Sequence, residues 1–262
     1  MKLRIYQVDA FTEEVFKGNP AAVVPLKSWL PDELMQKIAA ENNLSETAFV
    51  VADGDYYLIR WFTPTVEVDL CGHATLATAH VLFQHEGYSG DLIKFISPRT
   101  GALDVRKEEL GMLTLDFPVD EIKRIDLDSS IFHGFWKAPK ELWRGKSDYV
   151  LVYESEDDIR DTHIDFKEIE KVKTRGFIVT AQGKEVDFVS RWFGPQVGVE
   201  EDPVTGSAHT TLTVLWAEKL KKNSLTAIQM SARSGSLTCK LVGDRVHISG
   251  KAVTYLQGEI FI

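Results

Sequence analysis

The sequence has no long apolar run, few cysteines and no excess of positive charge, and each absence excludes a class of protein. No segment approaches the roughly 20 apolar residues of a membrane helix. Residues 1–11 alternate like a strand instead of forming a basic and then apolar leader, so we expect a cytoplasmic protein without a membrane partner. The net charge of −9 argues against a nucleic-acid partner, which would require a basic face.

The two cysteines and the histidines show no spacing typical of a metal site. Cys71 and Cys239 lie far apart and form no disulfide framework. His73 and His80 are seven positions apart and have no acidic partner at ligand spacing. No glycine-rich nucleotide loop follows a predicted strand. We therefore expect neither a metal nor a cofactor.

What the sequence does contain is an internal repeat. Residues 60–68 and 191–199 share the pattern Arg-Trp-Phe-x-Pro-x-Val-x-Val, and small residues follow at 72–75 and 206–209. The offset is 131 positions for the first pair and 134 for the second, which indicates a three-residue insertion in the second copy. A chain of 262 residues with 44% apolar residues can form two cores, so the repeat predicts two similar domains.

Strand-like runs dominate both halves, and helices are few. The predicted strands are residues 3–8, 47–52, 56–62, 113–117, 149–153, 177–180, 186–193, 237–242, 245–248 and 253–261. A helix is expected from Pro31 onward, and two more follow the repeated motifs at residues 73–85 and 207–222. The starts of these last two helices present unpaired N–H groups, so each can bind a carboxylate.

Glu46 is the first candidate for catalysis, although a carboxylate at this kind of position is usually a solvated turn residue. Aligning Phe49 with Phe177 places it opposite Thr174, so only one copy of the repeat supplies a carboxylate. This asymmetry fits a single general base acting on a bound acid. His73 is most often a plain core or surface histidine, but a helix start lowers its proton affinity and suits a neutral hydrogen-bond partner.

Asp202 and Ser207 are the next candidates, and simple capping of the second helix is at least as common a role for both. With His209 they contain the residue types of a hydrolase triad. The segment lacks the G-x-S-x-G elbow, however, and residues this close along one helix start do not line up easily, so we do not expect a hydrolase.

Several motifs resemble the PhzF phenazine-biosynthesis family, which shares the diaminopimelate epimerase fold. They lie in order from the first strand to the last, at residues 8–11, 18–23, 44–49, 62–64, 70–77 and 201–208. The resemblance implies an α+β protein of two pseudo-symmetric halves, each a curved, barrel-like mixed β-sheet around a central helix. It assigns residues 1–118 and 253–262 to the N-terminal half and 119–252 to the C-terminal half. It also implies an active site in the cleft between the halves, and a homodimer.

The resemblance also implies roles for individual residues. Glu46 would move a proton between carbons of a small carboxylic acid, supported by the catalytic residues His73, Asp202 and Ser207. The substrate-binding positions would be Asn19, Gly72, Ala74, Thr205 and Gly206. Related epimerases carry a cysteine at each helix start. Because we expect neither Cys71 nor Cys239 to occupy such a position, a two-thiol racemisation is not expected. The alternative is a protein of the same fold that binds an acidic metabolite without turning it over.

Overall fold

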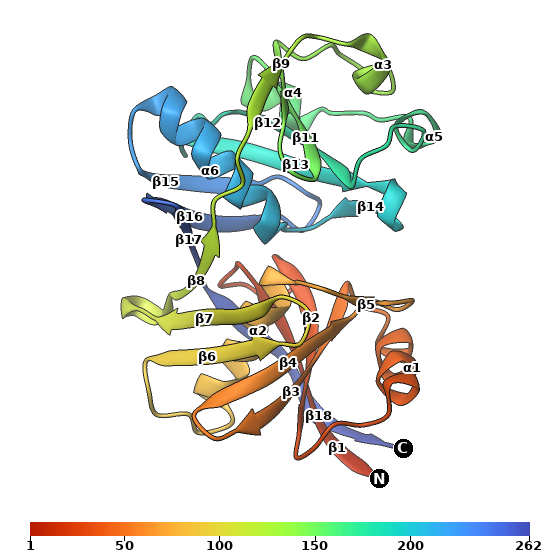
Figure 1. Ribbon diagram of the computed structural model, residues 1–262, viewed down its shortest axis with the longest axis vertical. Helices are drawn as coiled ribbons and strands as arrows, with labels where there is room; N and C mark the ends of the chain where they lie inside the picture. Colours follow the sequence, from red (N-terminus) through yellow and green to blue (C-terminus); the bar gives the residue numbers. More distant parts are fainter. The chain divides into compact units, whose positions relative to one another are not determined.

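The computed structural model describes residues 1–262, which divide into two compact units (Figure 1). Unit 1 consists of Met1–Phe117 and His247–Ile262, and unit 2 consists of Pro118–Val246. The chain thus returns to unit 1 within β17. None of the helices combines the length and apolar character needed to cross a membrane.

Unit 1 is a mixed sheet around one buried helix. Its strands are β1 (Lys2–Ala10), β2 (Asn19–Leu26), β3 (Glu46–Asp53), β4 (Tyr56–Phe62), β5 (Glu67–Val68), β6 (Leu92–Ser97), β7 (Gly101–Lys107), β8 (Leu113–Pro118), β17 (Arg245–Gly250) and β18 (Ala252–Phe261). Its helices are α1 (Asp32–Asn42), α2 (Gly72–Gln84) and the short η1 (Glu109–Gly111). The final strand, β18, pairs antiparallel with β1. Pro31 precedes α1 as its N-cap residue instead of being its first helical residue.

Unit 2 repeats this arrangement. Its strands are β9 (Lys123–Ile125), β10 (Glu141–Arg144), β11 (Asp148–Val152), β12 (Gly176–Gln182), β13 (Phe188–Gly194), β14 (Val199–Asp202), β15 (Ser224–Gln229) and β16 (Gly235–Val242). Its helices are α3 (Ser129–Phe132), α4 (Glu156–Arg160), α5 (Phe166–Ile169), α6 (Gly206–Leu220) and the short η2 (Pro195–Val197). Both units share one pairing pattern. Antiparallel, parallel, antiparallel, parallel and antiparallel pairs follow one another from β1 to β7 and from β10 to β16.

The central helices α2 and α6 are buried on nearly all sides, as a helix inside a curved sheet must be. Three of their buried threonines satisfy their own hydroxyl groups by donating to a carbonyl oxygen one turn earlier. Thr75 donates to Cys71 (2.6 Å) and Thr78 to Ala74 (2.7 Å), and Thr213 repeats this in α6 with His209 (2.5 Å). Polar residues can therefore fill these helices without leaving unpaired hydroxyl groups in the core.

The strand registers show which residue of unit 2 corresponds to Glu46. Glu46 is the first residue of β3 and lies beside Ala21 in a parallel pair. Gly176 is the first residue of β12 and lies beside Asp148 in the corresponding parallel pair. The antiparallel registers with β4 and β13 give the same match. The expected correspondence with Thr174 is therefore wrong by two residues. Only one copy of the repeat still supplies a carboxylate at this position, because the matching residue is a glycine.

The three-residue insertion of the second copy lies between β13 and β14. Arg60 Nε donates to Glu67 Oε1 at 2.7 Å, and Arg191 Nε donates to Glu201 Oε1 at the same distance. These two ion pairs are equivalent, but the partners are three positions further apart in unit 2. The helical turn η2 takes up the difference. The valines that end the two repeated motifs therefore do not occupy equivalent places.

Candidate active site

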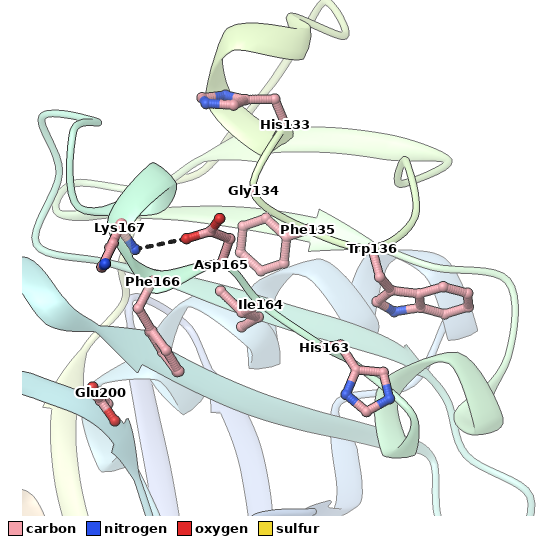
Figure 2. Close-up of a pocket in the computed structure, with 10 residues that line it drawn as sticks. All are labelled: His133, Gly134, Phe135, Trp136, His163, Ile164, Asp165, Phe166, Lys167 and Glu200. Carbon is pink, nitrogen blue, oxygen red and sulfur yellow. Dashed lines mark hydrogen bonds between the residues drawn. The ribbon is translucent and has the colours of Figure 1, made fainter.

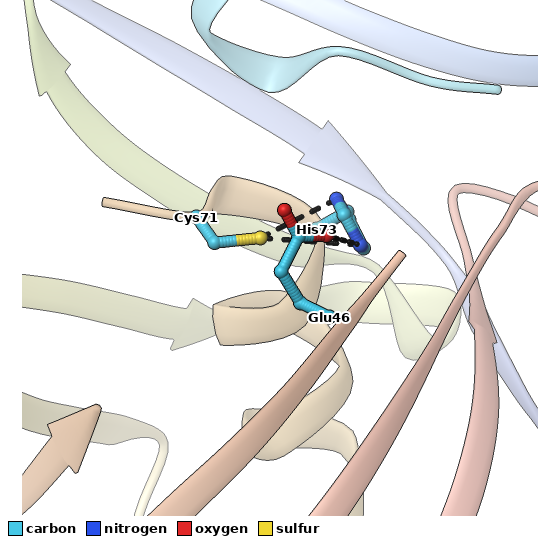
Figure 3. A group of neighbouring side chains, drawn as sticks. All are labelled: Glu46, Cys71 and His73. Carbon is cyan, nitrogen blue, oxygen red and sulfur yellow. Dashed lines mark hydrogen bonds and ion pairs between the residues drawn. The ribbon is translucent and has the colours of Figure 1, made fainter. Parts of the chain in front are cut away.

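Three side chains of unit 1 meet at the N-terminus of α2. Glu46 begins β3, His73 is the second residue of α2, and Cys71 is the N-cap residue of this helix. His73 Nε2 lies 3.1 Å from Glu46 Oε2, and Cys71 Sγ lies 3.5 Å from His73 Nδ1. Figure 3 shows the three side chains pointing toward one another. The predicted residues Glu46 and His73 are thus brought together, and Cys71 joins them.

Asn19 completes this group from the start of β2. Its side-chain nitrogen lies 3.1 Å from His73 Nδ1, and the residue is fully buried. The preceding Gly18 has a φ of +64°, a backbone conformation that suits glycine. Glycine at this position therefore allows the chain to turn into β2 and to bring Asn19 against the imidazole.

Glu46 has one oxygen that lacks an aligned hydrogen bond. Oε2 is buried and accepts none, although His73 Nε2 is only 3.1 Å away. The side chain as a whole is 17% exposed, so it is not sealed off from solvent. A buried carboxylate oxygen without a donor is energetically unfavourable, and in native proteins it commonly marks a functional position.

The charge states of His73 and Cys71 differ from the sequence-based expectations. Burial opposes protonation of His73, but the Glu46 carboxylate 3.1 Å away favours the charged imidazole and raises its pKa above the usual value. The expectation of a lowered proton affinity was therefore wrong, because it considered the helix and not the neighbours. Burial raises the pKa of Cys71 to about 11, so its thiol is protonated at neutral pH.

Cys71 also corrects the expectation that no cysteine stands at a helix start. It is the N-cap residue of α2, and its counterpart before α6 is Thr205. Cys239 is buried in β16 instead, with a hydrogen bond to Thr213, where burial raises its pKa to about 12. One helix start therefore carries a thiol and the other a hydroxyl. Two thiols at the two helix starts remain excluded.

In unit 2, Asp202 and Thr205 form a rigid loop before α6. Thr205 Oγ1 donates to Asp202 Oδ2 at 2.6 Å. Gln229, fully buried at the end of β15, accepts from Thr205 N at 2.8 Å and donates to the Asp202 carbonyl oxygen at 2.7 Å. Sequence reasoning did not find Gln229, because its partners lie more than 20 positions earlier in the chain. Gln229 thus holds the loop together with the hydrogen bond between Thr205 and Asp202.

Ser207 is held by an arginine that sequence reasoning also missed. Arg175 Nη1 donates to Ser207 Oγ at 2.9 Å, and Arg175 Nε donates to Asp148 Oδ1 at 2.8 Å. Asp148 also accepts from Trp192 Nε1 at 3.1 Å. Burial opposes the charge of Arg175, but its hydrogen bond with Asp148 outweighs burial and raises its pKa. Because Ser207 Oγ accepts from this cation, its own O–H proton is available to a ligand.

The hydrolase triad is not formed. His209 is fully buried, and its Nδ1 donates to the Thr205 carbonyl oxygen at 2.8 Å. Its Nε2 has no hydrogen-bond partner, and burial lowers its pKa to about 4. Ser207 is bonded to Arg175 and not to this imidazole. Ser207 therefore lacks the base that a nucleophilic serine needs.

The chain is similar to known proteins over nearly its whole length. A family model described as phenazine biosynthesis-like protein matches residues 8–258. The chain belongs to this phenazine biosynthesis-like family. An uncharacterized isomerase of Pseudomonas aeruginosa is 50% identical over 260 residues, which cover 99% of both chains. The phenazine biosynthesis-like domain-containing protein of Homo sapiens is 37% identical over 290 residues, again covering 99% of each.

Solved structures agree with this membership. A crystal structure of a PhzF-family phenazine biosynthesis protein from Enterococcus faecalis has a TM-score of 0.97 and 45% identity over the whole of both chains. A hydroxyproline epimerase from Agrobacterium vitis has a TM-score of 0.63 at 11% identity, covering 99% of this chain and 92% of the other. This second likeness shows the fold alone. The predicted α+β, epimerase-like fold is confirmed, and the family includes relatives named as isomerases.

The other predicted substrate-binding residues lie in the first turns of α2 and α6. Gly72 and Ala74 flank His73 in the first turn of α2, and Gly206 opens α6. Ala74 is fully buried, so its side chain does not reach solvent. Gly206 is also buried, whereas Gly72 is partly exposed. Because the N–H groups of a first helical turn lack intrahelical partners, Gly72 is the best candidate of the three for binding an anion.

An open depression of about 820 Å³ elsewhere in unit 2 contains none of the predicted residues (Figure 2). Its walls include Trp136, His163 and Asp165. Trp136 N donates to the His163 carbonyl oxygen at 3.2 Å, and Asp165 caps α5 by accepting from Lys167 N at 3.1 Å. These groups maintain local backbone structure. The depression therefore carries no constellation for catalysis.

Proposed function

We propose that the protein is an isomerase that moves a proton between two carbons of a small carboxylic acid, with Glu46 as both base and acid. The observation that carries this proposal is the buried Oε2 of Glu46, which accepts no aligned hydrogen bond. No backbone or side-chain donor is aligned with this oxygen, and the His73 imidazole lies beside it at 3.1 Å. Membership in a family with relatives named as isomerases supports the same class of reaction.

The reaction balances with this one residue. Glu46 removes a proton from a carbon whose C–H bond is activated, and the electron pair moves into the neighbouring double-bond system. The same carboxyl group then returns the proton to a second carbon. No oxidant or co-reactant is consumed, so the proposed reaction needs no cofactor. His73, 3.1 Å from the carboxylate, would position the substrate and stabilise the charge that develops.

The substrate carboxylate is assigned to the helix start of α2, where the N–H groups of Gly72 and His73 and the helix dipole favour an anion. We further propose that Asp202, Thr205, Gly206 and Ser207 of unit 2 serve the same reaction, as the family resemblance implies. Ser207 would contribute its hydroxyl proton to a substrate oxygen, because Arg175 already occupies an acceptor position of Oγ.

The test is deuterium uptake from deuterated water into a panel of small carboxylic acids that includes 2,3-dihydro-3-hydroxyanthranilate, followed by NMR. We expect uptake with the wild-type protein and a loss of about 10²- to 10⁴-fold for Glu46→Gln. Glu41→Gln, an exposed glutamate at the end of α1, is the matched control and should keep full activity. Full activity of Glu46→Gln would refute the base. A panel acid that raises the melting temperature but takes up no deuterium would instead favour a binding protein.

A further inference from the structure

We propose that Glu46, Cys71 and His73 form a binding site for a divalent cation of the Zn²⁺ type. These residues each offer one ligand atom, and the three atoms lie within 4.8 Å of one another. The ligands lie at positions 46, 71 and 73, and this spacing matches no regular metal-binding motif. The proposed binding site does not depend on the isomerase activity proposed above. The effect of a bound ion on catalysis does depend on that activity.

The Cys71 side chain must rotate before the three atoms can hold a small tetrahedral ion, because Sγ lies 3.5 Å from His73 Nδ1 and 3.9 Å from Nε2. With usual zinc bond lengths, ligand atoms at tetrahedral angles lie about 3.4 to 3.6 Å apart. Here His73 Nε2 is 3.1 Å from Glu46 Oε2 and 3.9 Å from Cys71 Sγ. Changes of about half an ångström, within the reach of side-chain rotation, would bring these two pairs to the required separations. A water molecule would supply the fourth ligand, as in three-ligand zinc sites.

The donor set selects the class of metal. A thiolate, an imidazole and a carboxylate together suit Zn²⁺ and Co²⁺, whereas Mg²⁺ requires oxygen ligands in an octahedron. On binding, the Cys71 thiol releases its proton to solvent as the sulfur–metal bond forms, and His73 releases the proton on Nε2 as this nitrogen binds the ion. The released protons make binding tighter at higher pH.

Two features of the surroundings favour occupancy by a cation. Glu46 Oε2 is buried without an aligned donor, so an ion would satisfy an acceptor that the protein leaves open. Asn19 lies 3.1 Å from the opposite ring nitrogen of His73. With its amide turned so that the oxygen faces the ring, Asn19 would accept the Nδ1 proton and orient the imidazole, the usual arrangement behind a metal-binding histidine.

The consequence for catalysis rests on the proposed function. An ion held by Glu46 would occupy the oxygen that is to take the substrate proton, so Zn²⁺ would inhibit the isomerase reversibly. The site would then make activity sensitive to free zinc.

Cobalt titration of the full chain tests the site without any substrate. After chelator treatment and reduction, we expect one equivalent of Co²⁺ to produce a thiolate-to-metal charge-transfer band, which Zn²⁺ abolishes and Mg²⁺ does not. Cys71→Ala should lack the band, and Cys239→Ala, the matched control at the other buried thiol, should keep it. Glu46→Gln should weaken binding at least about tenfold, since even outer-shell changes cost 10- to 100-fold.

Absence of the band in the wild-type protein would overturn the proposal, and so would a band that survives Cys71→Ala. If Cys71→Ala does not fold, unchanged cobalt affinity in Glu46→Gln overturns it equally. Deuterium uptake measured with and without Zn²⁺ separates the two proposals. A cobalt band together with unimpaired exchange at saturating Zn²⁺ would support the metal site and remove Glu46 as the base.

Discussion

Replacing Gln229 by leucine should destabilise the loop that precedes α6. The glutamine accepts from Thr205 N at 2.8 Å and donates to the Asp202 carbonyl oxygen at 2.7 Å and to Thr205 Oγ1 at 3.1 Å. Leucine has similar bulk but leaves the buried Thr205 N–H without its acceptor. A buried unpaired group costs about 1 to 3 kcal/mol, so the free energy of unfolding should fall by about this amount.

Urea unfolding followed by circular dichroism measures this difference, and Gln182→Leu is the matched control. Gln182 ends β12 in the same unit with an exposed side chain, so its replacement should change the free energy of unfolding by less than about 0.5 kcal/mol. If Gln229→Leu proves no less stable than Gln182→Leu, Gln229 does not hold the loop and the hydrogen-bond reasoning fails.

Two further predictions concern backbone conformation and pH. Gly18→Ala should be far more destabilising than Gly54→Ala in urea unfolding. Both glycines have positive φ, which costs about 1 kcal/mol in alanine. Only at Gly18 would the new Cβ also overlap the Ala10 carbonyl oxygen. Equal losses in the free energy of unfolding would contradict this. His209 has its pKa lowered from 6.5 to about 4, so between these values the unfolded chain binds a proton that the folded protein does not. The free energy of unfolding should therefore fall by about 3 kcal/mol as pH drops from 6.5 to 4, and His209→Asn should remove this part of the pH dependence; identical pH profiles would refute it.

The sequence predicted many of the strands and all three long helices, but it missed several strands, among them β2 and β6. β4 has the predicted bounds, and α2 and α6 start one residue before their predicted starts. β2 was not among the predicted strands, although it pairs with β1 on one side and β3 on the other. It begins Asn19-Pro20 and contains Pro25, and proline normally marks the edge of a sheet. Pairing with β1 and β3 therefore outweighed the low strand propensity of the prolines in β2.

The error in the repeat alignment has a physical cause. Strand side chains alternate with a period of two, so a shift of two residues keeps every apolar side chain on its original face. The aromatic residues of β3 and β12 can therefore be matched in two ways that look equally good in sequence. Only the pairing with the neighbouring strands distinguishes them, and this information is not local. The site partners Arg175 and Gln229 escaped prediction for the same reason, because they come from strands or strand ends distant in the chain.

Comparison of the two copies supports our proposal that Glu46, and not Asp202, is the base. Where unit 1 has Glu46 at the start of β3, unit 2 has Gly176, and its carboxylate stands instead at the end of β14. Asp202 Oδ2 accepts a 2.6 Å hydrogen bond from Thr205 Oγ1 in the loop beside it. Glu46 Oε2 accepts no aligned hydrogen bond and faces the imidazole of His73 at 3.1 Å. The two helix starts are therefore similar, but only the carboxylate of unit 1 lies beside a group that can exchange a proton with it.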